Sequence, residues 1–541
     1  MSRLLAVSAW TNRDESLEPV MDAWSTAVET VRACLAAGVR EFVVCAGARN
    51  AALIEALARA EENDKVRLWR HFEERSAGFF ALGRILATGE PCAVVTTSGT
   101  AAAELLPAVV EAHYQARPLV AITADRPACF RGTGAPQAIE QVGIFGVYAR
   151  TSQEGEWFAH WSKAGPLHLN VEIEEAFSPA AVTFDSPAEF VPLKSRLDVS
   201  GLARWLRDDL YRGLVVMIGG LDPEDREEVF HFCQSLGAPV VAETTSGLRE
   251  ALQGYALPDP DRWLREKPPG KILRLGEVPS GRFWRDLEDL PGTSVWSVSR
   301  AGFPGLVRES QSNRGQVARV LQALGDIEEA GDALDYFPEM SRRANLIDEL
   351  LEAYPDSEPA MVRTLSLYAS YGDSLYLGNS LPIREWNLFA QWERPIANVR
   401  ANRGANGIDG QLSTWLGWTA EQKETWAVVG DLTALYDLAA PMLLGQTDNE
   451  GRVLAVINNG GGKIFQRLPR LESLSPRAAE CLLNPQSADF SGMAKLWNMR
   501  HVRISRADEF DLFEGGGDTV LLEIVPDEEQ TKQFWAKWDR S

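Results

Sequence analysis

Short apolar runs alternate with longer amphipathic segments along the chain, a pattern that predicts parallel β-strands joined by helices. Each run is continuous rather than alternating, which is typical of strands covered on both faces of a sheet. In the first third of the chain, strands are expected at 38–47, 91–99 and 118–127, and helices at 51–62, 74–88 and 101–115. This order predicts a doubly wound α/β domain.

Two further sets of apolar runs follow, so the sequence predicts a fold of three doubly wound α/β domains. The second set comprises 214–220, 238–247, 271–279 and 293–299, and the third comprises 373–380, 395–404, 426–432, 452–461 and 519–525. Loop-like sequence separates the sets near 185–196 and 332–341. We therefore expect domains at 1–188, 189–340 and 341–541, and the sequence shows no internal repeat.

The charge of the chain narrows its class of partner. Its 541 residues include 54 Lys and Arg and 76 Asp and Glu, which gives a formal net charge of −22. A surface this acidic argues against a general nucleic-acid or anionic-membrane binder, because phosphate groups attract basic surfaces. A small anionic ligand is still compatible, since a few local arginines can outweigh the overall field.

The apolar runs and the cysteine spacing also indicate where in the cell the protein is located. No run of about 18 apolar residues is present, so we expect no membrane insertion. The N-terminus carries charged residues in place of a long apolar core, so no signal peptide is expected. The six cysteines are widely spaced and form no C-x-x-C pair. This spacing indicates neither a zinc site nor a disulfide framework, and it favours a cytoplasmic protein.

Polar residues follow two neighbouring apolar runs of the third set. Gly-Asp-Leu at 430–432 ends one run, and Asn-Asn-Gly-Gly at 458–461 ends the next. In an open parallel sheet both segments lie at the carboxyl edge, where ligands bind. Carboxylate, amide and carbonyl oxygens suit Mg²⁺, and helices starting near Thr433 and Gly462 would offer N–H groups to a phosphate. Two ordinary strand-to-helix turns are the alternative.

An ATP-binding loop is a further alternative for the glycine run 460–462. It is not supported, because Lys463 is followed by Ile464 rather than by Ser or Thr, and because the leading glycine of that motif is not in place.

Eight stretches taken together resemble a known family. They are HFEERSAGFFALG (71–83), TTSGTA (96–101), ITADRP (122–127), GAPQAIEQVGIF (134–145), GNSLPIRE (378–385), NRGANGIDGQLST (402–414), GDLTALYDL (430–438) and NNGGGKIFQRLP (458–469). In this order they resemble the thiamine-diphosphate-dependent enzymes and, among these, the 2-succinyl-5-enolpyruvyl-6-hydroxy-3-cyclohexene-1-carboxylate synthases of menaquinone biosynthesis. The match covers the first and third expected domains and is weak in the middle one.

The resemblance implies pyrimidine-binding, central and diphosphate-binding domains in this order. It also implies a homodimer or homotetramer with active sites between chains, and the cofactors thiamine diphosphate and Mg²⁺ (or Mn²⁺). Within the resemblance, Asp431, Asn459 and the carbonyl of Gly461 are the metal ligands, and Asn458 is a turn residue. The residues implied to contact the cofactor are Glu74, Ser98, Gly99, Ile408, Gly430, Asp431, Leu432, Asn459, Ile464 and Phe465.

Glu74 is the implied catalytic residue. An acid at the start of a helix is more commonly a solvated residue that complements the helix dipole. In the family, however, the glutamate directly before R-x-x-G faces the aminopyrimidine ring of the cofactor, and the match places this role on Glu74 rather than Glu73. Ile408 corresponds to the bulky residue that bends the cofactor, although core packing would also explain it.

The implied reaction is decarboxylation of 2-oxoglutarate and addition of the resulting succinyl-semialdehyde carbanion to isochorismate. Both substrates are dianions, and an arginine fork matches a carboxylate with two hydrogen bonds. The residues that match substrate positions of the family are Arg49, Arg126, Gln137, Arg282, Ser380, Arg384 and Arg403. Among them, Arg282 stands where the family usually has lysine.

Two departures from the family pattern leave the acceptor open. Ala48 replaces a serine hydroxyl beside Arg49, and Pro136 replaces an asparagine beside Gln137. A thiamine-diphosphate-dependent decarboxylase or carboligase with another acceptor is therefore the first alternative. A cofactor-binding but catalytically silent scaffold is the second, and the presence of Glu74 and Asp431 argues against it.

Overall fold

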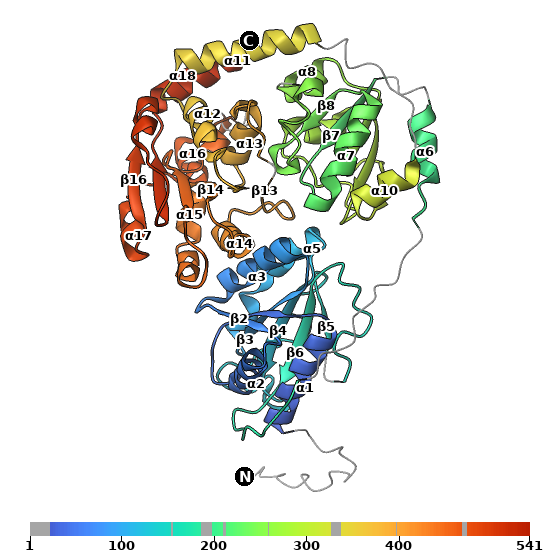
Figure 1. The fold of residues 1–541 in the computed structure, drawn as a ribbon, viewed down its shortest axis with the longest axis vertical. Coiled ribbons are helices and arrows are strands. Elements are labelled where there is room, and N and C mark those ends of the chain that lie inside the picture. Colours follow the sequence, from blue (N-terminus) through green and yellow to red (C-terminus); the bar gives the residue numbers. More distant parts are fainter. Residues whose placement is uncertain are drawn as a thin grey trace, which may run out of the picture.

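The computed structural model describes residues 22–152, 155–184, 197–208, 213–257, 259–325, 337–396, 398–467 and 473–540. These residues form three parallel β-sheets, each flanked by helices (Figure 1). The predicted fold class of three α/β domains is therefore confirmed. In the view of Figure 1 the first sheet lies below the other two, and the second and third sheets lie side by side.

The first sheet has the strand order β2-β1-β3-β4-β6-β5, with every pair parallel. Its strands are β1 (Glu41–Val44), β2 (Arg67–Arg70), β3 (Cys92–Thr96), β4 (Leu119–Asp125), β5 (Arg150–Ser152) and β6 (Leu167–Glu172). Its helices are α1 (Ala23–Ala36), α2 (Ala51–Glu62), α3 (Glu74–Thr88), α4 (Thr100–Ala103) and α5 (Leu106–Tyr114). The helix expected at 101–115 is divided in two, because Pro107 lacks an N–H group and starts a new helix.

The second sheet has the strand order β11-β10-β9-β7-β8. Its strands are β7 (Leu214–Ile218), β8 (Val240–Ala242), β9 (Lys271–Leu275), β10 (Ser294–Ser299) and β11 (Gln311–Arg314). Its helices are α6 (Ser200–Arg207), α7 (Pro223–Leu236), α8 (Pro260–Glu266), α9 (Arg282–Asp286) and α10 (Val317–Leu324). All of its strands except the edge strand β11 were predicted from the apolar runs.

The third sheet has the strand order β13-β12-β14-β15-β17-β16. Its strands are β12 (Ser374–Leu377), β13 (Val399–Arg400), β14 (Thr425–Gly430), β15 (Val453–Ile457), β16 (Arg500–Ile504) and β17 (Val520–Ile524). Its helices are α11 (Phe337–Ala353), α12 (Glu358–Ala369), α13 (Leu381–Phe389), α14 (Gln411–Trp418), α15 (Asp431–Tyr436), α16 (Pro476–Leu483), α17 (Ser491–Leu496) and α18 (Glu528–Trp538). Numbered within its own domain, this order is identical to that of the first sheet, although the sequence shows no repeat.

Five strands have no counterpart among the predictions: β2, β5, β6, β11 and β16. Their sequences are polar, as in the edge strands β11 (QSNR) and β16 (RHVRI). Strand β6 lies inside the sheet, yet it carries buried His168 and Asn170, which bond Thr123 of the neighbouring strand. A search for apolar runs misses such strands because their polar groups are satisfied by one another.

The first and third domains share one hydrophobic core, centred on the crossing of α3 and α14. Phe80 of α3 and Trp415 of α14 are both buried in it. The helices approach closely at Gly83 and Gly417, where no side chain separates the two backbones. The interface is therefore as tightly packed as a domain interior.

A buried carboxylate joins all three domains. Asp222 accepts hydrogen bonds from Arg117 of the first domain at 2.6 Å, from Arg400 of the third at 3.1 Å, and from Arg300 of the second. Burial alone raises the pKa of Asp222, but the three guanidinium groups outweigh it and hold the pKa well below its ordinary value. The carboxylate is therefore ionised, and it offsets positive charge from three separate elements.

The predicted domain boundaries remain proposals. The boundary expected between 188 and 189 lies outside the described residues. The boundary expected between 340 and 341 falls within α11, whose buried Ile347 and Leu350 pack with Phe534 of α18 in the third domain. The junction is therefore better placed before α11.

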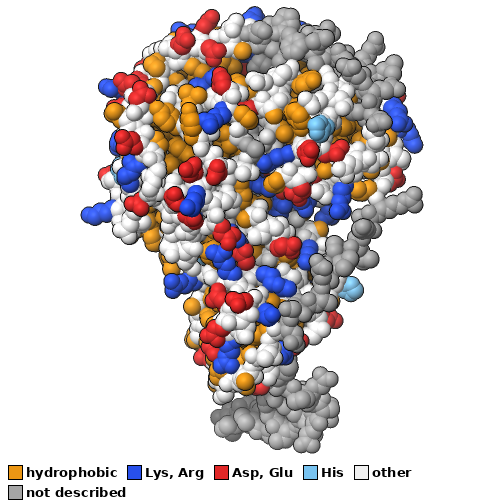
Figure 2. Space-filling view, in the orientation of Figure 1, with side chains coloured by type: hydrophobic (Ala, Val, Ile, Leu, Met, Phe, Trp, Pro, Cys, Tyr) orange, Lys and Arg blue, Asp and Glu red, His pale blue; other side chains and the backbone are white. Residues whose placement is uncertain are grey.

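Figure 2 shows acidic and basic side chains interspersed over the face in view, so the surplus of acid does not gather there in one patch. Within the described ranges, no helix is both long and apolar enough to cross a membrane.

Candidate active site

The carboxyl edge of the third sheet brings Asp431 and Asn459 together. Strands β14 and β15 are paired up to Gly430 and Ile457, so the residues that follow them emerge side by side. Oδ2 of Asp431 accepts hydrogen bonds from the backbone N–H groups of Gly460 at 2.9 Å and Gly461 at 2.7 Å. These bonds fix the turn after β15 against a carboxylate that is only 2% exposed.

The side chain of Asn459 has its two ends in different environments. Its Nδ2 donates to both carboxyl oxygens of Glu358, each at 3.0 Å. Its Oδ1 is buried and has no hydrogen-bond donor among the described residues. Burying an amide oxygen without a partner is costly, so this atom is suited to a ligand absent from the protein chain itself, such as a cation.

The donor set fits a hard divalent cation such as Mg²⁺ or Mn²⁺. It combines the Asp431 carboxylate, Oδ1 of Asn459 and the carbonyl of Gly461, which accepts the N–H of Lys463 at 2.8 Å and retains a second lone pair. The neighbouring Asn458 instead donates to Glu523 at 2.7 Å and to the carbonyl of Ala488. Its contacts are those of a turn residue.

The turns after these strands differ in part from the expectation. A helix, α15, begins at Asp431, two residues before the predicted start, and Gly430 is its N-cap. The helix expected near Gly462 is instead a single 3₁₀ turn, Lys463–Arg467, because the glycine run adopts left-handed backbone at Gly460 (φ 85°). Ile464 and Phe465 lie in this turn and are half-buried.

A network of amides fixes the loop that carries Ile408. Nδ2 of Asn379 donates to the carbonyls of Asn402 and Gly407, each at 2.8 Å, and Nε2 of Gln411 donates to the same Gly407 carbonyl at 2.6 Å. Ile408 follows this fixed carbonyl and is half-buried. Its position is therefore set by polar contacts of the backbone beside it rather than by core packing.

Arg384 and Arg403 come together without a carboxylate partner. Arg384 donates to the carbonyl of Ser380 at 2.7 Å, and Arg403 donates to Oδ1 of Asn379 at 2.9 Å. Burial lowers the pKa of Arg384, and the charge of Arg403 lowers it further. Among the described residues neither arginine forms a direct ion pair, although Glu243 and Asp261 lie close enough to Arg384 to raise its pKa. Ser380 has φ 76°, a strained conformation typical of functional sites.

In the first domain the structure separates the roles of two adjacent acids at the start of α3. The carboxylate of Glu73 caps the helix, accepting the N–H groups of Arg75 at 3.0 Å and Ser76 at 3.1 Å. Glu74 makes no such cap. Burial raises its pKa, and the charges of Glu73 and Glu104 raise it further. Glu74 therefore has no capping role, and its carboxyl group holds a proton more readily than an exposed glutamate does.

The turn after β3 lies against the loop of Gln137. Gly99 (φ 86°) donates its N–H to Gln141 at 2.8 Å, and a Cβ on Gly99 would lie 3.1 Å from the Cα of Gln137. The hydroxyl of Ser98 is buried and has no partner among the described residues. This turn therefore also presents an unsatisfied polar group at the carboxyl edge of the first sheet.

The other arginines predicted to bind substrate are engaged by other groups or lie exposed at the surface. Arg49 is bound within its own domain, by Glu175 at 2.6 Å and by the carbonyl of Ile173 at 3.1 Å. Arg126 donates to the carbonyl of Pro136 at 2.9 Å. The side chain of Arg282 is 55% exposed and lies 3.6 Å from Asp286. Its neighbour Arg285, which the sequence did not predict as a site residue, lies close enough to Arg384 to lower the pKa of Arg384.

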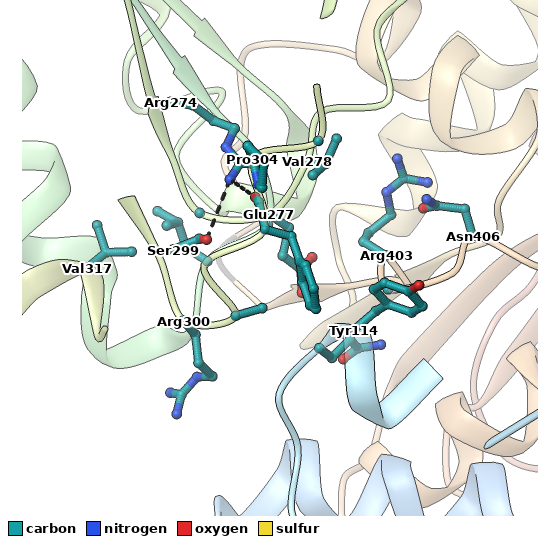
Figure 3. A pocket seen from close by; sticks show the side chains of 18 of the residues that line it. Tyr114, Arg274, Glu277, Val278, Ser299, Arg300, Pro304, Val317, Arg403 and Asn406 are labelled. Atoms are coloured by element: carbon teal, nitrogen blue, oxygen red, sulfur yellow. Dashed lines mark hydrogen bonds between the residues drawn. The ribbon is translucent and has the colours of Figure 1, made fainter. Parts of the chain in front are cut away.

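A cavity of about 490 Å³ lies where the three domains meet. Figure 3 shows Tyr114 entering from the first domain, Arg274 and Glu277 from the second, and Arg403 and Asn406 from the third. Of the predicted site residues, only Arg403 lines it. The cavity therefore borders the candidate site through the loop of Arg403 and does not include the proposed metal ligands.

Sequence reasoning missed several residues that support the site. Gln486 donates to Oδ2 of Asp431 at 2.6 Å and to Oδ1 of Asn458 at 2.9 Å, and Glu358 binds Asn459. Burial raises the pKa of Glu358 to about 7. Neither residue carries a local signal, because both are distant in sequence from the segments they hold.

Comparisons with known proteins show what the chain is similar to. Residues 25–144 match the family model of the thiamine pyrophosphate enzyme N-terminal TPP binding domain. A 2-succinyl-5-enolpyruvyl-6-hydroxy-3-cyclohexene-1-carboxylate synthase of Akkermansia muciniphila is 51% identical over 515 residues, which cover 93% of this chain and 96% of the relative. The enzyme of the same name from Bdellovibrio bacteriovorus is 39% identical, covering 95% of this chain and 98% of the relative.

The fold is similar to a solved structure of lower identity. The crystal structure of benzoylformate decarboxylase from Polynucleobacter necessarius aligns with a TM-score of 0.69 at 13% identity, covering 94% of this chain and 99% of that chain. At this identity the likeness shows the fold alone.

Proposed function

The chain belongs to the family of 2-succinyl-5-enolpyruvyl-6-hydroxy-3-cyclohexene-1-carboxylate synthases, and on this premise we propose that it decarboxylates 2-oxoglutarate and transfers the remaining four-carbon unit to isochorismate. The products are CO₂ and the compound after which the family is named. The reaction requires thiamine diphosphate and a divalent cation, and it is a step of menaquinone biosynthesis.

The observation that carries the proposal is the cation-binding geometry at Asp431 and Asn459. A buried carboxylate and a partnerless amide oxygen lie at the ends of adjacent strands, where an open α/β sheet binds ligands. With the carbonyl of Gly461, they supply three oxygen ligands for Mg²⁺ or Mn²⁺. A cation held there would offset the charge of a diphosphate inside an otherwise acidic protein.

Thiamine diphosphate, when bound, supplies the nucleophilic carbon and the electron sink that loss of CO₂ from a 2-oxoacid requires. Glu74 would exchange a proton with the N1′ atom of the aminopyrimidine ring once the cofactor is bound. Its raised pKa supports this role, because a carboxyl group with a raised pKa holds a proton more readily and can return it during turnover.

Arg384 and Arg403 bind the carboxylates of the substrates. Their lack of a carboxylate partner among the described residues supports this assignment, since each can offer free N–H groups to an incoming anion. Ile408, Ile464 and Phe465 form the apolar walls that orient the cofactor and exclude water. Arg126, Gln137 and Ser380 complete the polar lining, whereas Arg49 has first to leave Glu175 if it is to bind substrate.

We further propose a homodimer or homotetramer whose active sites lie between chains. The groups that shift the pKa of Glu74 all lie in the first domain, and those that shift the pKa of Asp431 all lie in the third. A second copy can bring the two half-sites together. A cytoplasmic location is supported by six free cysteines, four of them buried.

The direct test is a reaction of the purified protein with thiamine diphosphate, Mg²⁺, 2-oxoglutarate and isochorismate, followed by identification of the product by mass spectrometry. We expect a product that contains both substrates less CO₂. A mixture lacking isochorismate is the control. CO₂ release that is independent of isochorismate, without the joint product, would refute the assignment of the acceptor.

A second candidate is a carboligase of the same cofactor with another acceptor. It is favoured by the ion pair that engages Arg49 and by Ala48, which cannot donate a hydrogen bond. Offering pyruvate and aromatic aldehydes as competing substrates in the same assay separates the two functions.

A further inference from the structure

Glu358 is a buried carboxylate that lies behind the proposed cation site and contacts one of its ligands. It is the first residue of α12 and is 3% exposed. Both of its oxygens accept hydrogen bonds from Nδ2 of Asn459, at 3.0 Å each. The contact joins two segments that are separated by 101 positions in the sequence.

Hydrogen bonds hold the backbone of Glu358 at the start of α12. Its own N–H donates to the hydroxyl of Thr531 in α18 at 3.0 Å. The preceding residue, Ser357, caps α12 by accepting the N–H of Ala360. A second buried carboxyl group, that of Glu385 in α13, is 1% exposed and lies close enough to Glu358 for each to affect the pKa of the other. The contact with α18 and the N-cap of α12 thus fix the backbone of Glu358, and Asn459 is the hydrogen-bond donor to its carboxyl group.

The position of the Glu358 carboxyl group determines which end of the Asn459 amide faces the cation. An amide carries a donor at one end and an acceptor at the other, and the two ends have nearly the same shape. Both oxygens of Glu358 accept hydrogen bonds here, so the carboxyl group selects Nδ2. Oδ1 therefore points the opposite way, and it is the buried atom that has no donor among the described residues.

Without this selection the amide could rotate and present an NH₂ group to the cation. That group repels a cation and cannot coordinate it. Polar partners that orient a metal ligand affect metal affinity nearly as strongly as the ligands themselves, typically by about 10- to 100-fold.

We propose that Glu358 is a positioning residue of the cation site, which keeps the oxygen of the Asn459 amide turned toward the ion. The inference rests on the proposed function, because it presupposes that Asp431 and Asn459 hold a divalent cation. It adds a residue outside the motif 458–461, at the start of a helix more than 70 residues before Asp431.

The test measures Mn²⁺ affinity of the full-length protein in the presence of thiamine diphosphate, by the electron paramagnetic resonance signal of free Mn²⁺. Glu358→Gln retains the size of the side chain but can donate to Oδ1 of Asn459, so we expect affinity to fall by roughly 10- to 100-fold. Glu352→Gln is the matched control, because Glu352 is exposed on α11 and its loss removes the same charge. We expect it to leave the affinity unchanged.

A double-mutant cycle separates orientation from simple attraction of the cation by a negative charge. Asn459→Asp presents an oxygen whichever way the side chain turns. If Glu358 acts by orientation, Glu358→Gln costs no affinity in the Asn459→Asp background. If Glu358 acts only through its charge, the loss is the same in both backgrounds, and the proposal is overturned.

Asp431→Ala distinguishes failure of this inference from failure of the proposed function. Loss of Mn²⁺ binding in Asp431→Ala with unchanged affinity in Glu358→Gln overturns only the role of Glu358. Absence of Mn²⁺ binding in the wild-type protein overturns both. Should Glu358→Gln fail to fold, Glu358→Asp keeps the carboxylate one methylene further away, and the proposal expects a smaller loss that again vanishes in the Asn459→Asp background.

Discussion

Gly83 of α3 and Gly417 of α14 face each other where the two helices cross, and neither position has room for a side chain. A Cβ on Gly83 would lie 2.2 Å from the carbonyl oxygen of Thr414, and a Cβ on Gly417 would lie 2.2 Å from that of Phe80. Backbone atoms cannot give way as a flexible side chain can. The contact between the first and third domains therefore depends on both glycines.

Gly83→Ala should accordingly separate the helices and destabilise the protein. Overpacking of a tight core costs about 1–3 kcal/mol, and the clash with backbone places this substitution at the upper end. The free energy of unfolding from chemical denaturation measures the effect. Gly492→Ala is the control, since Gly492 lies in helix α17 with open space where its Cβ would be, and it should be neutral or slightly stabilising. Equal stability of the two variants would contradict the close crossing.

Asp222→Asn should destabilise the junction of the three domains. The substitution leaves Arg117, Arg300 and Arg400 without the carboxylate that offsets them, and breaking a buried ion pair costs about 3–5 kcal/mol. Glu450→Gln, in an exposed pair with Lys423, is the matched control and should cost less than about 1 kcal/mol. Thermal unfolding followed by tryptophan fluorescence compares the two variants, and a similar small loss in both would argue against a structural role of Asp222.

The stability of the second domain should depend on pH through Asp225. Burial raises the pKa of this carboxyl group to about 6, with the charges of Asp222 and Glu224 contributing. Between about pH 4 and pH 6 the folded protein binds a proton that the unfolded chain has lost, so this group makes stability fall as pH rises. The effect is on the order of 3 kcal/mol across the window.

Asp225→Asn keeps an acceptor for the N–H of Ala318 but cannot ionise. Its unfolding free energy should therefore decline less than that of the wild type between about pH 4 and pH 6. Parallel curves for the two proteins would show that Asp225 does not titrate in this window.

Glu74→Gln should retain affinity for thiamine diphosphate and lose most of the turnover. The amide preserves the shape of the side chain but cannot transfer a proton, and loss of a general acid–base group costs roughly 10²- to 10⁴-fold in rate. Isothermal titration measures cofactor affinity, and release of CO₂ from 2-oxoglutarate measures turnover. Glu73→Gln is an informative comparison, because it removes part of a helix cap and should affect stability more than rate. Unchanged turnover in Glu74→Gln would exclude its proposed role.

Arg384→Lys should lower kcat/KM by roughly 10- to 100-fold while cofactor affinity stays the same, because lysine cannot form the paired hydrogen bonds that a carboxylate accepts from arginine. Arg262→Lys provides the control, since Arg262 is exposed and paired only with Glu266 among the described residues. Steady-state kinetics with each substrate varied in turn would show which carboxylate Arg384 binds. Equal values for both variants would remove Arg384 from the site.

Much of the fold was predictable because apolar runs mark strands that are covered on both faces. The helices 51–62 and 74–88 have the predicted bounds, and the family resemblance seen in the motifs is confirmed by the relatives. The strands that escaped prediction depend on tertiary context. Buried His168 and Asn170 of strand β6 form hydrogen bonds with Thr123 of the neighbouring strand β4, and no local pattern reveals such partners.

In the candidate site, too, local sequence patterns identify some residues, whereas others are recognisable only from contacts that form on folding. Asp431 and Asn459 were identifiable because each directly follows a strong apolar run, and adjacent parallel strands bring their ends together. Glu358 and Gln486 were not identifiable, since a glutamate at the start of a helix and a glutamine in a loop are unremarkable until the chain has folded. The ion pair between Arg49 and Glu175 likewise arises from residues 126 positions apart. The roles of these residues remain predictions.

Glu74 follows the second strand of the first sheet, and Ile408 follows the second strand of the third. The helices after them, α3 and α14, are therefore equivalent elements of two like folds, and these two helices cross at the interface. Equivalent elements meet in this way when two copies of one protein pair about a twofold axis. The interface between the first and third domains is therefore arranged like that of a symmetric dimer, although both halves belong to a single chain.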